Sequence, residues 1–251
     1  MDAPFALTTD AILGGRVTLQ QPARGHRVGH DAVLLAALAP AECRVMVDLG
    51  AGVGGAGLAF LARVPPAHGT LVEIDPDLAA LAQRNAQANG LSDRCRVAAA
   101  DVLALGRSSG PMVPEAGAAD LVLMNPPFNA AQAHQPSPHG GRARAHVAEE
   151  GLLRAWVTAA YRCLAPGGVL CAILRPEDIA ALLEALSGRF GAAELLPVHP
   201  RPDAPAVRLL ARAVKGRRTP PRLLPGLMLA DGAGTPTPAA QAVLRDAVPL
   251  G

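Results

Sequence analysis

The stretch that decides the fold is Arg44–Gly55, RVMVDLGAGVGG. Its first half is apolar and carries the β-branched Val45 and Val47, which predicts a short buried strand, and the glycines after it predict a tight turn. An apolar helix is expected to begin near Ala56. Glycines in such a turn let the backbone approach a ligand at the helix N-terminus. The stretch therefore predicts the first strand and helix of a ligand-binding α/β domain.

The alternation of strand and helix continues downstream of this turn. The expected elements are the strand TLVEID (70–75), the helix PDLAALAQRNAQAN (76–89), the strands RCRVAAAD (94–101) and ADLVLMN (119–125), a helix over 147–163, the strand GGVLCAIL (167–174), a helix over 177–188, and the strands ELLPVH (194–199) and AVRLLARAV (206–214). The last two form an antiparallel hairpin. This βαβ pattern predicts an α/β fold with a seven-stranded, mostly parallel sheet, an antiparallel last strand and helices on both faces.

The chain is expected to fold as one compact unit in three parts. These are an N-terminal lid (1–40), with a strand over 15–22 and a helix beginning near His30, a main domain (41–216), and a C-terminal tail (217–251) that contains a helix-like PAAQAVLRDA and packs on the same domain. Residues 106–118 and 129–146 are rich in turn-forming residues and are expected to be loops.

Composition and charge exclude several classes of protein. The formal net charge of +2 creates no global field, so a nucleic-acid surface would have to come from clustered arginines. Four cysteines without CxxC spacing fit the reducing cytoplasm. No basic–apolar leader and no apolar run of about 20 residues is present, so neither export nor membrane insertion is expected. The histidines at 134, 139 and 146 match no metal site, and no metal is expected.

Acidic residues at three successive strand ends predict the cofactor. Asp48 opens the glycine turn, where it would repel a pyrophosphate but suits a cationic amino group and a sulfonium. Glu73 and Asp75 end the next strand, where an acid can bind both ribose hydroxyls, and Glu73 is the preferred ligand. Asp101 can accept from the adenine amine while Val102 donates its backbone N–H. Each acid alone could be a helix cap, but together they predict S-adenosylmethionine. The glycines expected to line this cofactor are Gly50, Gly52 and Gly54.

The turn Asn125-Pro126-Pro127-Phe128 follows the fourth strand of the main domain and predicts the chemistry. An amine conjugated to a ring, or an amide, is a poor nucleophile because its lone pair is delocalised. The Asn125 amide oxygen and the Pro126 carbonyl can each accept one of its N–H groups, which turns the lone pair toward a methyl donor. The two prolines fix these acceptors, and Phe128 can stack on the flat target. These residues predict in-line methylation of a planar nitrogen without a covalent intermediate, and Asn125 is expected to touch the cofactor too.

These motifs resemble those of the class I S-adenosylmethionine-dependent methyltransferases, and the turn is similar to the (N/D)PP(F/Y/W) signature of amino and amide N-methyltransferases. The opening ILGGRVTLQQPARGHRVGHDAVLLAA (12–37) resembles the bacterial tRNA1(Val) adenine-N6 methyltransferase family, which modifies the adenine beside the anticodon. The resemblance covers almost the whole chain and includes GGRARAHVAEEG (140–151). It implies a Rossmann-like fold, a flipped adenine as the target, and closure of His30 and Asp31 over the cofactor. The Pro- and His-rich segment 132–139 departs from the family and leaves the substrate open.

Other substrates remain open. Release-factor methyltransferases share the Asn-Pro-Pro turn and methylate a protein glutamine; they usually carry a helical N-terminal domain, and about thirty residues before the lid helix are few for one. A guanine-N2 RNA methyltransferase and a catalytically inactive scaffold are further alternatives. The sequence does not set the oligomeric state. Either a solvated face or contact with RNA would explain the basic residues Arg142, Arg144, Arg208, Arg212, Lys215, Arg217 and Arg218.

Overall fold

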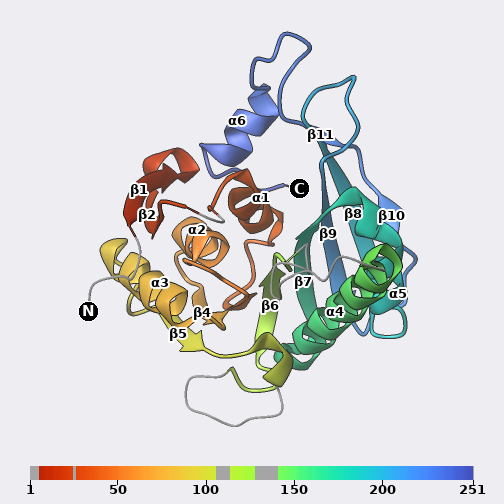
Figure 1. Ribbon diagram of the computed structural model, residues 1–251, viewed down its shortest axis with the longest axis horizontal. Coiled ribbons are helices and arrows are strands. Elements are labelled where there is room, and N and C mark those ends of the chain that lie inside the picture. Colours follow the sequence, from red (N-terminus) through yellow and green to blue (C-terminus); the bar gives the residue numbers. More distant parts are fainter. Residues whose placement is uncertain (1–5, 25–26, 106–113, 128–140, 251) are drawn as a thin grey trace.

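The computed structural model describes residues 6–24, 27–105, 114–127 and 141–250 (Figure 1). Its strands are β1 (Leu7–Ile12), β2 (Val17–Pro22), β3 (Val45–Leu49), β4 (His68–Glu73), β5 (Cys95–Ala99), β6 (Ala119–Met124), β7 (Leu164–Leu174), β8 (Phe190–His199), β9 (Arg208–Lys215), β10 (Arg222–Leu223) and β11 (Leu227–Met228). Its helices are α1 (His30–Leu38), α2 (Gly55–Arg63), α3 (Pro76–Ala88), α4 (Gly141–Cys163), α5 (Ile179–Leu186) and α6 (Pro238–Leu244), with 3-10 turns η1 (Leu13–Gly15), η2 (Val102–Ala104) and η4 (Pro176–Asp178).

The main sheet has the strand order β10-β8-β9-β7-β6-β3-β4-β5, with β11 also paired to β8. Strands β3 to β7 are parallel, and β9 runs antiparallel to both β7 and β8. The expected mixed sheet is therefore confirmed, and the short tail strands β10 and β11 extend it beyond the expected seven strands. Strand order reverses between β3 and β6, and open α/β sheets bind ligands at the carboxyl ends of the strands at such a point.

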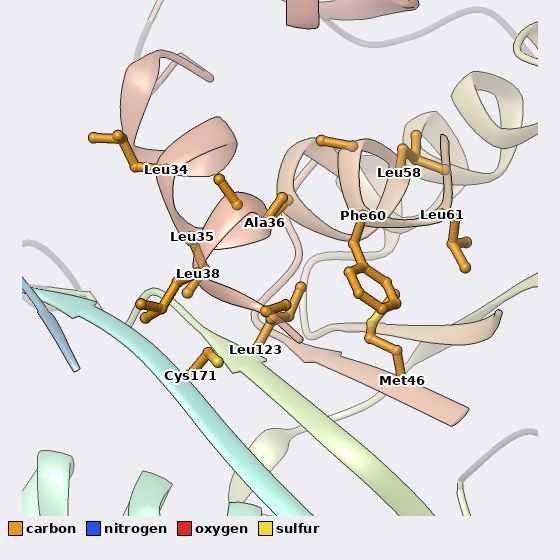
Figure 2. Packing of buried hydrophobic residues seen from close by; sticks show 14 of the residues in the cluster. Leu34, Leu35, Ala36, Leu38, Met46, Leu58, Phe60, Leu61, Leu123 and Cys171 are labelled. Carbon is orange, nitrogen blue, oxygen red and sulfur yellow. The ribbon is translucent and has the colours of Figure 1, made fainter. Parts of the chain in front are cut away.

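Helices cover both faces of the sheet, because its strands alternate apolar side chains between two cores. One core joins α1, α2 and α3 to the sheet, and the other joins α4 and α5 to the opposite face (Figure 1). Figure 2 shows the first core, with Phe60 of α2 beside Met46 of β3 and with Leu35 and Leu38 of α1 near Leu123 and Cys171. Six consecutive residues of α1, Val33–Leu38, are buried, so this helix is enclosed on all sides beyond its first turn. Both cores hold the carboxyl edge of the sheet in place.

The N-terminal part contains one strand more than the sequence predicted. Strands β1 and β2 form an antiparallel hairpin that lies outside the main sheet and contacts α3. The sequence of β1, LTTDAI, does not show the alternation of apolar and polar residues that predicts a strand, because none of its side chains is fully buried. Helix α1 begins at His30, as predicted.

Two further differences concern helices. Helix α4 begins at Gly141 instead of 147, so the last residues of the expected loop 129–146 are helical, while residues 129–140 lie outside the described part of the chain. In the tail, the predicted helix is α6, which contacts α1, and Leu250 donates its N–H to the Ala37 carbonyl at 2.8 Å. None of the helices in the described ranges has the length and apolarity needed to cross a membrane.

Candidate active site

The carboxyl edge of the sheet gathers the acidic and amide residues that the sequence singled out. Asp48 lies in β3, Glu73 is the last residue of β4, Asp101 follows β5 and Asn125 follows β6. Because these strands are parallel neighbours, their ends meet at one edge, and the cofactor and substrate residues come from adjacent loops. The sequence prediction of a shared site is therefore consistent with the topology.

The glycine turn between β3 and α2 needs its glycines for two different reasons. Gly50, Gly52 and Gly54 have φ angles of 68°, 56° and 93°, in the left-handed region that favours glycine. A Cβ at Gly50 would lie 2.5 Å from Cη2 of Trp156 on α4, and one at Gly54 would lie 3.0 Å from Cδ1 of Leu71. A Cβ at Gly52 would meet no described atom within 4 Å. Gly50 and Gly54 thus serve packing as well, whereas Gly52 leaves its backbone accessible to a ligand.

Glu73 is bonded to the glycine turn. Its carboxylate is 7% exposed; Oε2 accepts the Gly52 N–H at 2.8 Å and Oε1 accepts the Asp75 N–H at 2.9 Å. Each oxygen keeps acceptor capacity for a hydroxyl. Asp75 is instead the N-cap of α3, where its Oδ1 accepts the N–H groups of Asp77 at 2.9 Å and Leu78 at 3.3 Å. This division of contacts favours Glu73 over Asp75 as the ribose ligand.

Asp48 lies beneath the glycine turn, with 2% of its surface exposed. Its Oδ2 accepts the N–H of Gly57, in the first turn of α2, at 2.8 Å. Burial raises the pKa of Asp48 to about 7; the Gly57 N–H opposes this rise and the charge of Glu73 adds to it. The structure therefore gives Asp48 a partner in the loop backbone, and its contact with the cofactor amino group stays a prediction.

Asp101 is exposed, and its Oδ1 accepts the Leu103 N–H at 2.9 Å, so it caps η2 while Val102 is buried. Two large apolar side chains nearby were missed by the sequence reasoning. Ile74 and Leu103 are 66% and 38% exposed, and they follow Glu73 and Asp101 at the ends of the adjacent strands β4 and β5. An apolar residue just after a strand-end acid is the signal that could have identified them as candidate contacts for a purine ring.

Asn125 carries the unusual polar atom of the site. Its Oδ1 is buried and has no hydrogen-bond partner among the residues that the structure describes. A buried acceptor without a partner costs about 1–3 kcal/mol, so an N–H donor from a substrate would be favoured there. Pro126 is buried and Pro127 is exposed, while Phe128, the predicted stacking residue, lies outside the described ranges.

The first turn of α1 contains the two residues that were predicted to close over the cofactor, His30 and Asp31. His30 is exposed, and Asp31 forms an ion pair with Arg208 of β9, with 2.8 Å between Oδ2 and Nε. This contact connects α1 to the antiparallel part of the sheet. Closure of His30 and Asp31 over a cofactor stays a prediction.

The basic residues of β9 and of the turn after it lie at two different edges of the sheet. Arg208 and Lys215 begin and end an extended strand, roughly 24 Å apart. Because β9 is antiparallel to β7, Arg208 lies at the carboxyl edge of the parallel strands and Lys215 at the opposite edge. The exposed Arg217 and Arg218 follow Lys215. The sheet therefore separates the two ends of this group of basic residues, and contact of either end with RNA stays a prediction.

Like Arg208, the cations Lys215 and Arg212 have hydrogen-bond partners within the chain. Lys215 donates to the carbonyls of Tyr161 at 2.7 Å and Leu164 at 2.6 Å, and its Nζ lies 4.1 Å from the centre of the Tyr161 ring. Arg212 is bonded to Glu194 of β8 at 2.8 Å. These side chains stabilise the sheet and the end of α4.

The site as a whole fits S-adenosylmethionine. A glycine turn opens at Gly52, Glu73 holds that turn and retains acceptor capacity, and apolar side chains flank the next strand end. Asn125 supplies a buried acceptor on the other side of the switch point. These features together with the sheet order define a class I, S-adenosylmethionine-dependent methyltransferase.

Comparison with known proteins assigns the family. Residues 29–197 match the model of the methyltransferase small domain family, and the chain belongs to that family. The tRNA1(Val) (adenine(37)-N6)-methyltransferase of Porphyromonas gingivalis is 34% identical over 212 residues, which cover 78% of this chain and 79% of that protein. The release factor glutamine methyltransferase of Chlorobaculum tepidum is 29% identical over 75% of this chain and 65% of that protein. The protein is an S-adenosylmethionine-dependent N-methyltransferase.

A solved structure supports the same fold. The Agrobacterium tumefaciens protein Atu636, described as a predicted O-methyltransferase, superposes with a TM-score of 0.71 at 30% identity. The match covers 88% of this chain and 98% of that one. The Rossmann-like arrangement predicted from the sequence is therefore confirmed.

Proposed function

We propose that the enzyme methylates the exocyclic N6 of an adenine in tRNA. The single observation that carries the proposal is the buried Oδ1 of Asn125 at the end of β6, which has no hydrogen-bond partner within the described part of the chain and suits an N–H donor on a planar nitrogen. Two relatives at 34% and 33% identity, both from Porphyromonas gingivalis, are tRNA1(Val) (adenine(37)-N6)-methyltransferases. Such a substrate would place the enzyme in the cytoplasm.

The chemistry follows from the acceptors of the turn. The Asn125 amide oxygen accepts one N6–H, and the Pro126 carbonyl accepts the other. Both bonds strengthen as the nitrogen becomes tetrahedral and its lone pair leaves the ring system, so they stabilise the transition state more than the ground state. Prolines on both sides of this carbonyl restrict the backbone and keep the two acceptors fixed. Phe128 stacks on the flipped base in this scheme.

S-adenosylmethionine would supply the methyl group of its sulfonium and leave as neutral S-adenosylhomocysteine, while the methylated nitrogen releases one proton to water. On the protein side, Glu73 binds the ribose hydroxyls while it keeps its bond to the Gly52 N–H. The exposed Ile74 and Leu103 would pack on the adenine of the cofactor, and Asp101 would accept from its amine. The turn after β6 lies next to the turn after β3, which permits the in-line approach of nitrogen to methyl carbon.

We expect the first turn of α4 to meet the RNA backbone. Helix α4 has 23 residues, a length of about 34 Å, and its last residue leads directly into β7 at the amino edge of the sheet. Its first turn, which contains Arg142 and Arg144, therefore lies toward the edge where Asn125 lies. Arginines there can contact phosphates near the flipped base.

A second candidate is methylation of a protein glutamine. It is favoured by relatives that are release factor glutamine methyltransferases, at 29% and 28% identity. A side-chain amide presents the same two N–H groups to Asn125 and Pro126. The adenine substrate is preferred because the two Porphyromonas gingivalis adenine-N6 relatives are more similar to this chain than these two release factor relatives and match a larger share of their own length.

The test is a labelling experiment with the wild-type enzyme and Asn125→Ala. Each is incubated with radiolabelled S-adenosylmethionine and either bulk bacterial tRNA or release factor, and the products are digested to nucleosides or amino acids. Label in N6-methyladenosine that the variant loses supports the proposal. Label in methylglutamine or in N2-methylguanosine would show that the substrate is not adenine. An absence of transfer to every acceptor would contradict the proposal.

A further inference from the structure

One edge of the N-terminal hairpin has backbone N–H and C=O groups that no neighbouring strand in the described part of the chain pairs with. Strand β2 pairs with β1 on one side, and the outer side carries the backbone groups of Thr18 and Gln20. Two asparagines of the α3 region satisfy them. Asn89 accepts the Thr18 N–H at 2.9 Å and donates to the Thr18 carbonyl at 2.7 Å. Asn85 accepts the Gln20 N–H at 2.8 Å and donates to the Gln20 carbonyl at 2.9 Å.

The spacing explains how side chains can replace a strand. Residues four apart on a helix lie about 6 Å from each other on one face, close to the spacing of alternate residues along a strand. Asn85 therefore lies opposite Gln20, and Asn89 lies opposite Thr18. An exposed strand edge is a template for pairing with other chains, and this arrangement covers it.

Asn85 makes one contact that Asn89 does not. Its Nδ2 also donates to the Val53 carbonyl at 2.9 Å, in the glycine turn, and the Asn85 side chain is 1% exposed. The corresponding Nδ2 of Asn89 donates to the Asn85 carbonyl at 2.7 Å, near the end of its own helix. The two residues are thus alike toward the hairpin and different toward the glycine turn.

The Val53 carbonyl belongs to a peptide unit that is fixed from both sides. The next residue, Gly54, has a φ of 93° and donates its N–H to the Ala51 carbonyl at 2.8 Å. Rotation of this peptide would break both bonds. The Ala51 carbonyl shares its peptide unit with the Gly52 N–H, so the bond that Gly54 donates connects this peptide to the one that Glu73 holds. Loss of the amide donor would leave a buried carbonyl unsatisfied, which is costly, and the turn would adopt other conformations.

We propose that Asn85 is a positioning residue for cofactor binding, which holds the Val53–Gly54 peptide and the edge of the hairpin at the same time. Docking of the hairpin and affinity for the cofactor are then coupled, and the coupling is reciprocal. The inference goes beyond the proposed substrate, because it concerns only the cofactor and the chain itself.

The first test compares Asn85→Ala with the matched control Asn89→Ala, using calorimetric titration with S-adenosylhomocysteine. Each variant loses two bonds to the hairpin, but only Asn85→Ala releases the Val53 carbonyl. We expect Asn85→Ala to weaken binding about tenfold or more and Asn89→Ala to stay within about twofold of wild type. Equal losses in both variants, or no loss in Asn85→Ala, would overturn the proposal.

A second measurement needs no variant. Hydrogen exchange is followed at the Gln20 and Thr18 amides of the wild-type protein, with and without S-adenosylhomocysteine. We expect bound S-adenosylhomocysteine to slow exchange at Gln20 severalfold and at Thr18 less, because the Gln20 amide is held by the same side chain as the glycine turn. Exchange at Gln20 that does not respond contradicts the coupling. Neither experiment uses a methyl acceptor, so a failure of the proposed substrate would leave both results unaffected.

Discussion

The two halves of the carboxyl edge satisfy their polar groups in different ways. At the ends of β3, β4 and β5, the side chains of Asp48, Glu73 and Asp101 each accept a backbone N–H from the protein itself. At the end of β6, the Asn125 Oδ1 is buried and has no partner within the described residues. The cofactor half is internally satisfied, whereas the substrate half keeps an acceptor for its ligand.

This difference indicates how the protein responds to each of its two ligands. A loop whose hydrogen bonds are complete keeps its shape before binding, so little reorganisation is needed for the cofactor. An unpartnered acceptor instead gains its full hydrogen-bond energy only when a substrate N–H arrives. Mutations in the two halves should therefore separate cofactor affinity from the rate of methyl transfer.

The largest effect is expected for Asn125→Ala. Removal of one transition-state acceptor should lower the single-turnover rate of methyl transfer by about 10²–10³. Affinity for S-adenosylhomocysteine, measured by calorimetry, should stay within about threefold. A loss of affinity as large as the loss of rate would break the comparison, because it would place Asn125 in the cofactor half.

Glu73→Gln should show the reverse pattern. Loss of the charged acceptor for ribose hydroxyls should weaken S-adenosylhomocysteine binding by about 10- to 100-fold. The control is Asp75→Ala, which removes the N-cap of α3 and should cost about 1 kcal/mol in the free energy of unfolding with affinity nearly unchanged. If Asp75→Ala weakens binding more than Glu73→Gln, the assignment of the ribose ligand is reversed.

A further effect, on the free energy of unfolding and not on binding or rate, is expected in the pH dependence of stability. The pKa of Asp48 is about 7 in the folded protein and near its ordinary value of 3.8 when unfolded, so the folded state binds more protons between these values. Its contribution to the free energy of unfolding is then fully present below about pH 4 and is lost by up to about 1.4 kcal/mol per pH unit up to about pH 7.

The variant Asp48→Asn isolates this contribution, since an amide oxygen can still accept the Gly57 N–H. Urea denaturation between pH 4 and pH 8 should give a wild-type stability that falls more steeply with pH than that of the variant. Parallel curves for the two proteins would show that the buried carboxyl does not titrate in this range.

The smallest effects concern RNA. Arg142→Ala/Arg144→Ala should weaken tRNA binding severalfold and reduce its dependence on salt, because these residues lie in the first turn of α4. Arg217→Ala/Arg218→Ala, at the opposite edge of the sheet, should stay within about twofold. Filter binding at several salt concentrations measures both. If both double variants weaken tRNA binding equally, the RNA contacts both edges of the sheet.

Much of this edge could be predicted from the sequence, because the signals are local. An apolar strand followed by DLGAGVGG predicts a strand, a turn and a helix, and acids at successive strand ends predict a shared edge once the strands are parallel. The turn at Asn125–Pro127 was located in the same way. These predictions needed only periodicity and the rule for parallel strands.

The remainder depended on tertiary contacts. Arg208 and Lys215 are close in sequence, but an extended strand carries them to opposite edges. The partner of Asp48 is a backbone N–H on the next helix, and nothing in the motif gives that geometry. Asn85 looked like an ordinary helix residue because both of its targets, in β2 and in the glycine turn, are distant in sequence.

The contact between Trp156 and Gly50 has an optical consequence. Trp156 is the only tryptophan in the chain, it is 8% exposed, and a Cβ at Gly50 would lie 2.5 Å from its ring. The tryptophan fluorescence therefore arises from a single residue. Its ring lies against the turn that is expected to bind the cofactor, and the residue belongs to the helix that follows the turn at Asn125. The protein carries its own fluorescent reporter, which can follow ligand binding in real time without any attached dye.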